Sequence, residues 1–165
     1  MQNFISEDNI IIADIVRKPK HSSVTRAYVR AGPRRRLYHD PQVTTAAVVT
    51  CGGLCPGLNN ILRELTRTLI VQYGVTRVLG VADGFNGFNE ARHPVLPLNL
   101  DTVSTIHNQG GTLLGASRGG FDLEIIKAFI MKHSVNVLFI IGGDGTHRGA
   151  LKISEAAVQW GLPVR

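Results

Sequence analysis

The sequence predicts an α/β fold built on a doubly wound, mostly parallel sheet that is incomplete in this chain. Short apolar stretches alternate with segments of helical periodicity, and glycine-rich turns follow three of the apolar stretches. The 165 residues are 44% hydrophobic, which is enough apolar material for one globular core. The 18 glycines favour tight turns and close backbone approaches.

Residues 1–40 are expected to form an extension that leads into an α/β domain at residues 41–165. Gly32 and Pro33 interrupt any sustained periodicity there. The extension also holds most of the net charge of +6, including the basic run Arg34–Arg36. Because no nucleic-acid motif accompanies this run, we interpret it as solvated surface and expect no nucleic-acid partner.

The first unit of the domain is a strand, a turn and a helix. Residues 44–51 (TTAAVVTC) are apolar or β-branched on both faces, as in a strand buried in a parallel sheet. Gly52 and Gly53 end this strand. Apolar residues at helical spacing then predict a helix over residues 58–72.

The remaining elements follow the same alternation. A strand over residues 75–82 precedes the glycine-punctuated loop DGFNGF, and the most strongly predicted strand, VNVLFII, precedes GGDGT. Helical segments are expected at residues 101–107, 122–132 and 150–160, with a further strand beginning near residues 162–164.

Glycine-rich turns at strand ends predict an anion-binding cleft. Ligands of such sheets bind beyond the carboxyl ends of the strands, where GGLCPG, DGFNGF and GGDGT are all expected. Gly52 and Gly53 allow backbone N–H groups to approach a phosphate, although a tight strand-to-helix turn also needs glycine. Asp144 suits a magnesium ion that is shared with phosphate oxygens, and a turn or capping role is its alternative. Arg118 can bridge phosphate oxygens or lie on the surface.

The sequence shows no pattern of a zinc site, a secretory leader or a membrane-spanning segment. Cys51 and Cys55 lack the partners of a zinc site, so we interpret them as reduced structural thiols. The chain has neither a secretory leader pattern nor a long apolar run. A cytoplasmic location without membrane contact is therefore expected.

Four motifs taken together resemble the 6-phosphofructokinase family. They are VVTCGGLCPGLNNILRE, DGFNGF, GGTLLGASRGG and IIGGDGTHRGA, in that order. With the RAGPRR stretch, they are most similar to the ATP-dependent enzymes of plants and trypanosomatids. The resemblance covers residues 31–165 and implies phosphoryl transfer from ATP to fructose 6-phosphate in glycolysis.

The resemblance also implies the residues that bind Mg-ATP. Arg118 would be the catalytic residue, Asp144 would lie toward Mg²⁺, and Gly145 would leave room for ATP where pyrophosphate-using relatives carry an aspartate. The full set implied to contact the nucleotide is Gly53, Phe85, Arg118, Gly119, Gly143, Asp144, Gly145 and Thr146.

The family pattern places a Thr-x-Asp-x-Asp stretch, which supplies the catalytic base, after Arg165. We therefore expect the sequence as given to hold the ATP and magnesium site, to lack the base and the sugar-phosphate site, and to be inactive alone. A homotetramer is implied for the full-length enzyme. GGDGT also marks NAD kinases and lipid kinases, so these remain alternatives, as does a truncated, non-catalytic nucleotide-binding or regulatory module.

Overall fold

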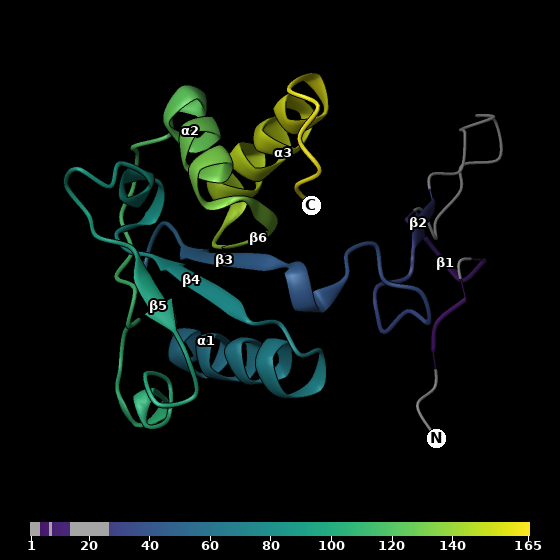
Figure 1. Cartoon of the computed structure of the whole chain (residues 1–165), viewed down its shortest axis with the longest axis horizontal. Helices are drawn as coiled ribbons and strands as arrows, with labels where there is room; N and C mark the ends of the chain where they lie inside the picture. The colour runs from purple at the N-terminus through teal and green to yellow at the C-terminus, as the bar shows by residue number, and fades with distance from the viewer. Residues whose placement is uncertain (1–3, 7, 14–26) are drawn as a thin grey trace, which may run out of the picture. The chain divides into compact units, whose positions relative to one another are not determined.

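The computed structural model describes residues 4–6, 8–13 and 27–165 (Figure 1). The chain divides into two compact units, Met1–Tyr38 and His39–Arg165. In the first unit, strand β1 (Ile10–Ile12) pairs antiparallel with β2 (Ala27–Val29). Arg34 donates a hydrogen bond of 2.9 Å to the carbonyl oxygen of Ser6, so one arginine of the basic run has a local structural role. The expectations for residues 14–26 lie outside the described residues.

The second unit contains a four-stranded sheet in the order β5-β4-β3-β6. The parallel strands β3 (Thr45–Thr50), β4 (Arg77–Val81) and β6 (Val135–Ile141) match the predicted apolar stretches. The edge strand β5 (Leu96–Leu98) runs antiparallel to β4 and was not predicted, since three residues are too few to show a period. The prediction of a mostly parallel α/β sheet is confirmed.

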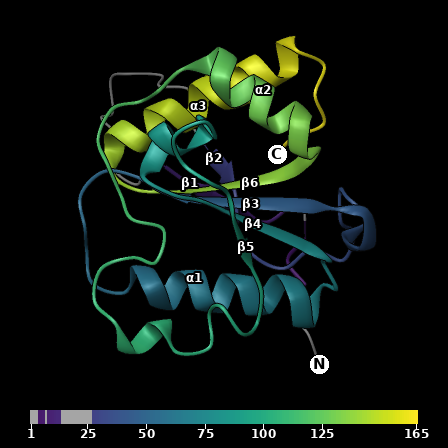
Figure 2. The ribbon, with the colours of Figure 1, turned by 60° about the vertical axis from the view of Figure 1, so that its left-hand side comes forward.

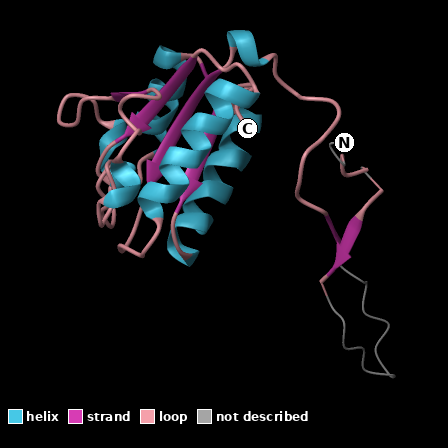
Figure 3. Ribbon diagram, turned by 90° about the horizontal axis from the view of Figure 1, so that it is seen from below, coloured by secondary structure: helices cyan, strands magenta, loops and turns pink. Residues whose placement is uncertain are grey.

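Helices cover both faces of this sheet (Figures 2 and 3). Helix α1 (Leu58–Arg67), which continues as a π-helical turn to Gln72, covers one face, and α2 (Leu123–His133) and α3 (Asp144–Gln159) cover the other. Successive residues of β3 alternate between the two layers: Ala46 and Val48 pack toward α1, whereas Ala47 and Val49 pack toward α2 and α3. The central strand is therefore buried on both faces, as its sequence predicts.

Two helix predictions need correction. The last helix begins at Asp144 instead of near residue 150, because the turn at Gly142 and Gly143 leads directly into helical backbone. Residues 101–107 form turns that end in a 3-10 helix at Ile106–Asn108. Here the side chain of Asn99 accepts from the N–H of Thr102, which favours a local turn over a helix.

Candidate functional site

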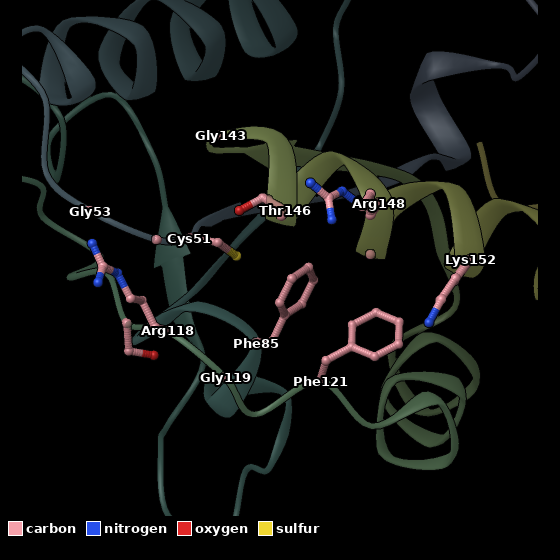
Figure 4. A pocket seen from close by; sticks show the side chains of 14 residues that line it. Cys51, Gly53, Phe85, Arg118, Gly119, Phe121, Gly143, Thr146, Arg148 and Lys152 are labelled. Atoms are coloured by element: carbon pink, nitrogen blue, oxygen red, sulfur yellow. The ribbon is translucent and has the colours of Figure 1, made fainter.

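The loops at the carboxyl ends of β3, β4 and β6 enclose one pocket of about 480 Å³ (Figure 4). The loop after Gly115 completes it from the fourth side. This volume lies in the range of pockets that bind small ligands. The edge of the sheet that carries the pocket is the one expected from the glycine-rich motifs.

Seven of the eight residues that the resemblance implied for the nucleotide line this pocket. They are Gly53, Phe85, Arg118, Gly119, Gly143, Gly145 and Thr146. Asp144 does not line it: this residue is exposed in the first turn of α3, between two glycines that do. The structure thus brings together residues that are up to 93 positions apart in the sequence.

Ser117 ties three of the loops together. Its hydroxyl donates to the carbonyl oxygen of Asp83 at 2.7 Å and accepts from Asn86 at 2.9 Å. Its own carbonyl oxygen accepts from the N–H of Gly52 at 2.9 Å. These bonds fix the backbone beside Arg118 relative to the loops after β3 and β4. Sequence reasoning missed Ser117, because its partners are distant along the chain.

The N-terminus of α3 faces the pocket without a capping side chain. Gly143 is the N-cap residue and provides no side-chain hydrogen bond, while Gly145 and Thr146 of the first turn line the pocket. The N–H groups of a first helical turn have no partners within the helix and carry partial positive charge. This end of α3 is therefore suited to a phosphate group.

Three cations line the pocket: Arg118, Arg148 and Lys152. Among the described residues none of them makes a hydrogen bond or ion pair, and no carboxylate joins the lining. One guanidinium nitrogen of Arg118 lies 3.9 Å from the position that a Cβ on Gly53 would occupy. Unpaired cations beside exposed backbone N–H groups make the pocket attractive to a polyanion.

Two phenyl rings form the apolar part of the pocket. Phe85 and Phe121 are in edge-to-face contact, with ring centroids 5.2 Å apart. Gly149 of α3 packs against both rings: a Cβ there would lie 3.0 Å from Phe85 Cζ and 3.1 Å from Phe121 Cε2. The pocket thus combines a polyanion site with an apolar surface that fits a planar ring.

Sequence reasoning missed Phe121, Arg148 and Lys152. The last two lie four residues apart, which places them on one face of a helix. That signal was lost because the helix was expected to start near residue 150. Phe121 follows the GASRGG motif directly.

Cys51 lies in the floor of the pocket as a neutral thiol. Burial raises its pKa to about 11, although a backbone hydrogen bond from Phe85 acts in the opposite direction. Cys55, in the same loop, is exposed. Both cysteines are free, but only Cys51 is buried as a structural thiol would be, and it is too weakly acidic to act as a nucleophile near neutral pH.

The described residues contain no group of three or more His, Cys, Asp or Glu side chains that could hold a metal ion by themselves. Asp144, in the first turn of α3, is a carboxylate between two residues that line the pocket, Gly143 and Gly145. A magnesium ion commonly takes one or two carboxylates and completes its shell with phosphate oxygens and water. The residues present therefore fit a magnesium ion that arrives with its phosphate ligand.

Comparison with known proteins identifies the family. Residues 45–164 match the family described as Phosphofructokinase. The chain belongs to the phosphofructokinase family. ATP-dependent 6-phosphofructokinase 1 of Arabidopsis thaliana is 45% identical over 93% of this chain and 32% of its own length, and ATP-dependent 6-phosphofructokinase of Trypanosoma cruzi is 45% identical over 79% of this chain and 27% of its own length.

Solved phosphofructokinase structures share the fold. Pichia pastoris phosphofructokinase in the T-state aligns with a TM-score of 0.61 at 25% identity, over 74% of this chain and 13% of that one. A pyrophosphate-dependent phosphofructokinase from Marinobacter aquaeolei aligns with a TM-score of 0.62 at 18% identity, over 74% of this chain and 32% of that one. The chain spans about a quarter to a third of the length of curated phosphofructokinases that it matches. In the part of the chain that the structure describes, no helix is long and apolar enough to cross a bilayer.

Proposed function

We propose that the protein transfers a phosphoryl group from Mg-ATP to fructose 6-phosphate, giving fructose 1,6-bisphosphate, and that this chain supplies the site for the nucleotide and its phosphates. The observation that carries the proposal is the convergence of Gly53, Arg118 and the start of α3 on one pocket. Family membership and similarity to relatives named ATP-dependent 6-phosphofructokinase support it.

The pocket divides the work of binding between backbone and side chains. N–H groups at the start of α3 and at Gly53 bind phosphate oxygens, and Arg118 balances the negative charge that is redistributed as the phosphoryl group moves. The hydrogen bonds of Ser117 fix the backbone beside Arg118 before the substrate arrives. Because the backbone donors are preorganised by the fold, little reorganisation of these groups is needed during the transfer.

Asp144 would hold the magnesium ion together with the phosphates. When bound, this ion neutralises phosphate charge during phosphoryl transfer. The carboxylate is exposed and adjacent to Gly143 and Gly145, so it can approach a cation that sits on phosphates in the pocket.

Gly145 supports ATP over pyrophosphate as the phosphoryl donor. It lines the pocket, and a Cβ at this position would meet no heavy atom within 4 Å. No protein atom would clash with a side chain at this position. Such a side chain would occupy part of the pocket itself. An aspartate would fill that space and bring a negative charge toward the nucleotide phosphates.

The acceptor is tested by giving the natural-length protein Mg-ATP with fructose 6-phosphate, NAD or diacylglycerol and measuring ADP release. Of these three acceptors, we expect only fructose 6-phosphate to support turnover. Turnover with NAD or diacylglycerol instead would replace the proposed substrate, and ATP binding without turnover on any of the three would favour the non-catalytic module. A homo-oligomeric state and a cytoplasmic location belong to the same proposal; size-exclusion chromatography with light scattering and imaging of the tagged protein test them.

A further inference from the structure

A second pocket, of about 330 Å³, shares the lining residues Phe85 and Phe121 with the first. Its remaining lining comes from the segment that follows β4 and from the start of α2: Asn86, Asn89, Arg92, His93, Gly120, Asp122 and Ile125. None of the polar residues in this lining was assigned to the proposed nucleotide site. We propose that this second pocket binds a small hydroxylated anion, of the class of a phosphorylated polyol.

The donors of the pocket are placed to receive an anionic group. Among the described residues, the guanidinium of Arg92 makes no hydrogen bond or ion pair. Asn89 uses its side-chain oxygen to accept from the N–H of Ala91, which leaves its amide N–H groups free. His93 Nε2 lies 3.7 Å from a carboxylate oxygen of Asp83. Arginine and amide donors that converge in one cavity match the oxygens of a phosphate or carboxylate.

The pocket also contains a hydrogen-bond acceptor, which favours a ligand that carries hydroxyl groups as well as an anionic group. Asp122 Oδ1 accepts from the N–H groups of Glu124 and Ile125 at 2.9 and 3.2 Å, and so caps α2. Its second carboxylate oxygen accepts no hydrogen bond from the described residues. A hydroxyl group of a ligand would satisfy that oxygen, so a ligand that carries a phosphate and separate hydroxyl groups can use the donors and the acceptor of the pocket together.

The pocket is held open by the backbone around it. Gly120 adopts φ +71°, and a Cβ at this position would lie 2.7 Å from the backbone nitrogen of Asn86. The turn that carries Phe121 therefore packs directly on Asn86, against both its side chain and its backbone nitrogen. Phe85 and Phe121 contact each other edge to face and form the boundary between the two pockets.

The test is isothermal titration calorimetry of glycerol 3-phosphate, inorganic phosphate and glycerol into the natural-length protein. We expect glycerol 3-phosphate to bind several-fold more tightly than inorganic phosphate, and glycerol not to bind. Arg92→Ala should weaken glycerol 3-phosphate binding at least tenfold. Asp122→Asn, which keeps a capping oxygen, should reduce the preference over inorganic phosphate.

Two control variants separate this site from the proposed nucleotide site. Arg67→Ala removes another exposed arginine, on α1, and Arg118→Ala removes a cation of the first pocket. Both should bind glycerol 3-phosphate as the wild type does. Absence of binding, unchanged binding in Arg92→Ala, or loss in Arg118→Ala would each overturn the proposal. Loss in Arg118→Ala would place the ligand in the first pocket. Since none of these outcomes depends on ATP turnover, the proposed function is tested separately.

Discussion

Replacing Gly142 by alanine should destabilise the junction between β6 and α3. A Cβ at this position would lie 2.7 Å from Thr146 Cβ and 2.8 Å from the carbonyl oxygen of Cys51. Neither atom is the far end of a flexible side chain, so the backbone at the end of β3 or in the first turn of α3 must move. Overpacking of this kind costs about 1–3 kcal/mol.

The neighbouring residue provides the matched control. A Cβ on Gly143 would meet nothing within 4 Å, and its φ of −86° is one that alanine adopts freely. We expect Gly143→Ala to change the free energy of unfolding by less than about 0.5 kcal/mol.

Thermal melting followed by circular dichroism measures the difference. At roughly 2–4 °C per kcal/mol for a chain of this size, Gly142→Ala should lower Tm by roughly 2–12 °C, with Gly143→Ala within about 2 °C of the wild type. Equal melting temperatures for the two variants would refute the argument that close backbone approach, rather than turn geometry, requires glycine at position 142.

Three further predictions concern the charged and reactive groups. Gly145→Asp should weaken ATP binding at least about 100-fold, because two unit charges 4 Å apart repel by about 4 kcal/mol near a protein surface. Gly145→Ala, which adds no charge, should bind ATP normally. Calorimetry that shows full ATP affinity in the aspartate variant would contradict this prediction. Burial raises the pKa of Glu90, but hydrogen bonds from Lys132 and His133 outweigh it and hold the pKa below its ordinary value of 4.5. The ionised carboxylate of Glu90 therefore stabilises the fold above pH 4.5, and this stabilisation is lost as the pH falls through the lowered pKa of the folded state. The wild type should lose stability in acid more steeply than Glu90→Gln. Melting temperatures that fall equally with pH in the two proteins would argue against this. Iodoacetamide at pH 7.5 should modify the exposed Cys55 and spare Cys51, whose pKa burial raises to about 11, and mass spectrometry finding modified Cys51 in folded protein would exclude the buried neutral thiol.

Local signals made part of the fold predictable from the sequence. The strand VNVLFII coincides with β6 because apolar residues there are continuous and glycines end the run at once. Helix α2 was located because Asp122 is a capping residue immediately before a helical apolar pattern. The glycine-rich motifs located the pocket, because strand ends of a parallel sheet meet at one edge.

Features that depend on contacts between residues distant in the sequence could not be predicted. The hydrogen-bond partners of Ser117 lie in loops that are far from it in the sequence and come close only when the sheet has formed. Arg148 and Lys152 enter the pocket only because α3 begins directly at the glycine turn, which the propensities of Asp144, Gly145 and Thr146 do not favour. Here the junction between strand and helix, rather than local preference, determines where the helix begins.

Calorimetry of Mg-ATP binding to the wild type, Arg118→Ala and Arg67→Ala in the natural-length protein tests the central claim most directly. If Arg118 and the glycine loops form one phosphate site, Arg118→Ala should weaken ATP binding by about 10- to 100-fold, as expected for loss of a charge-assisted hydrogen bond, while Arg67→Ala binds normally. Equal ATP affinity in all three proteins would contradict the assignment of this pocket to the nucleotide phosphates.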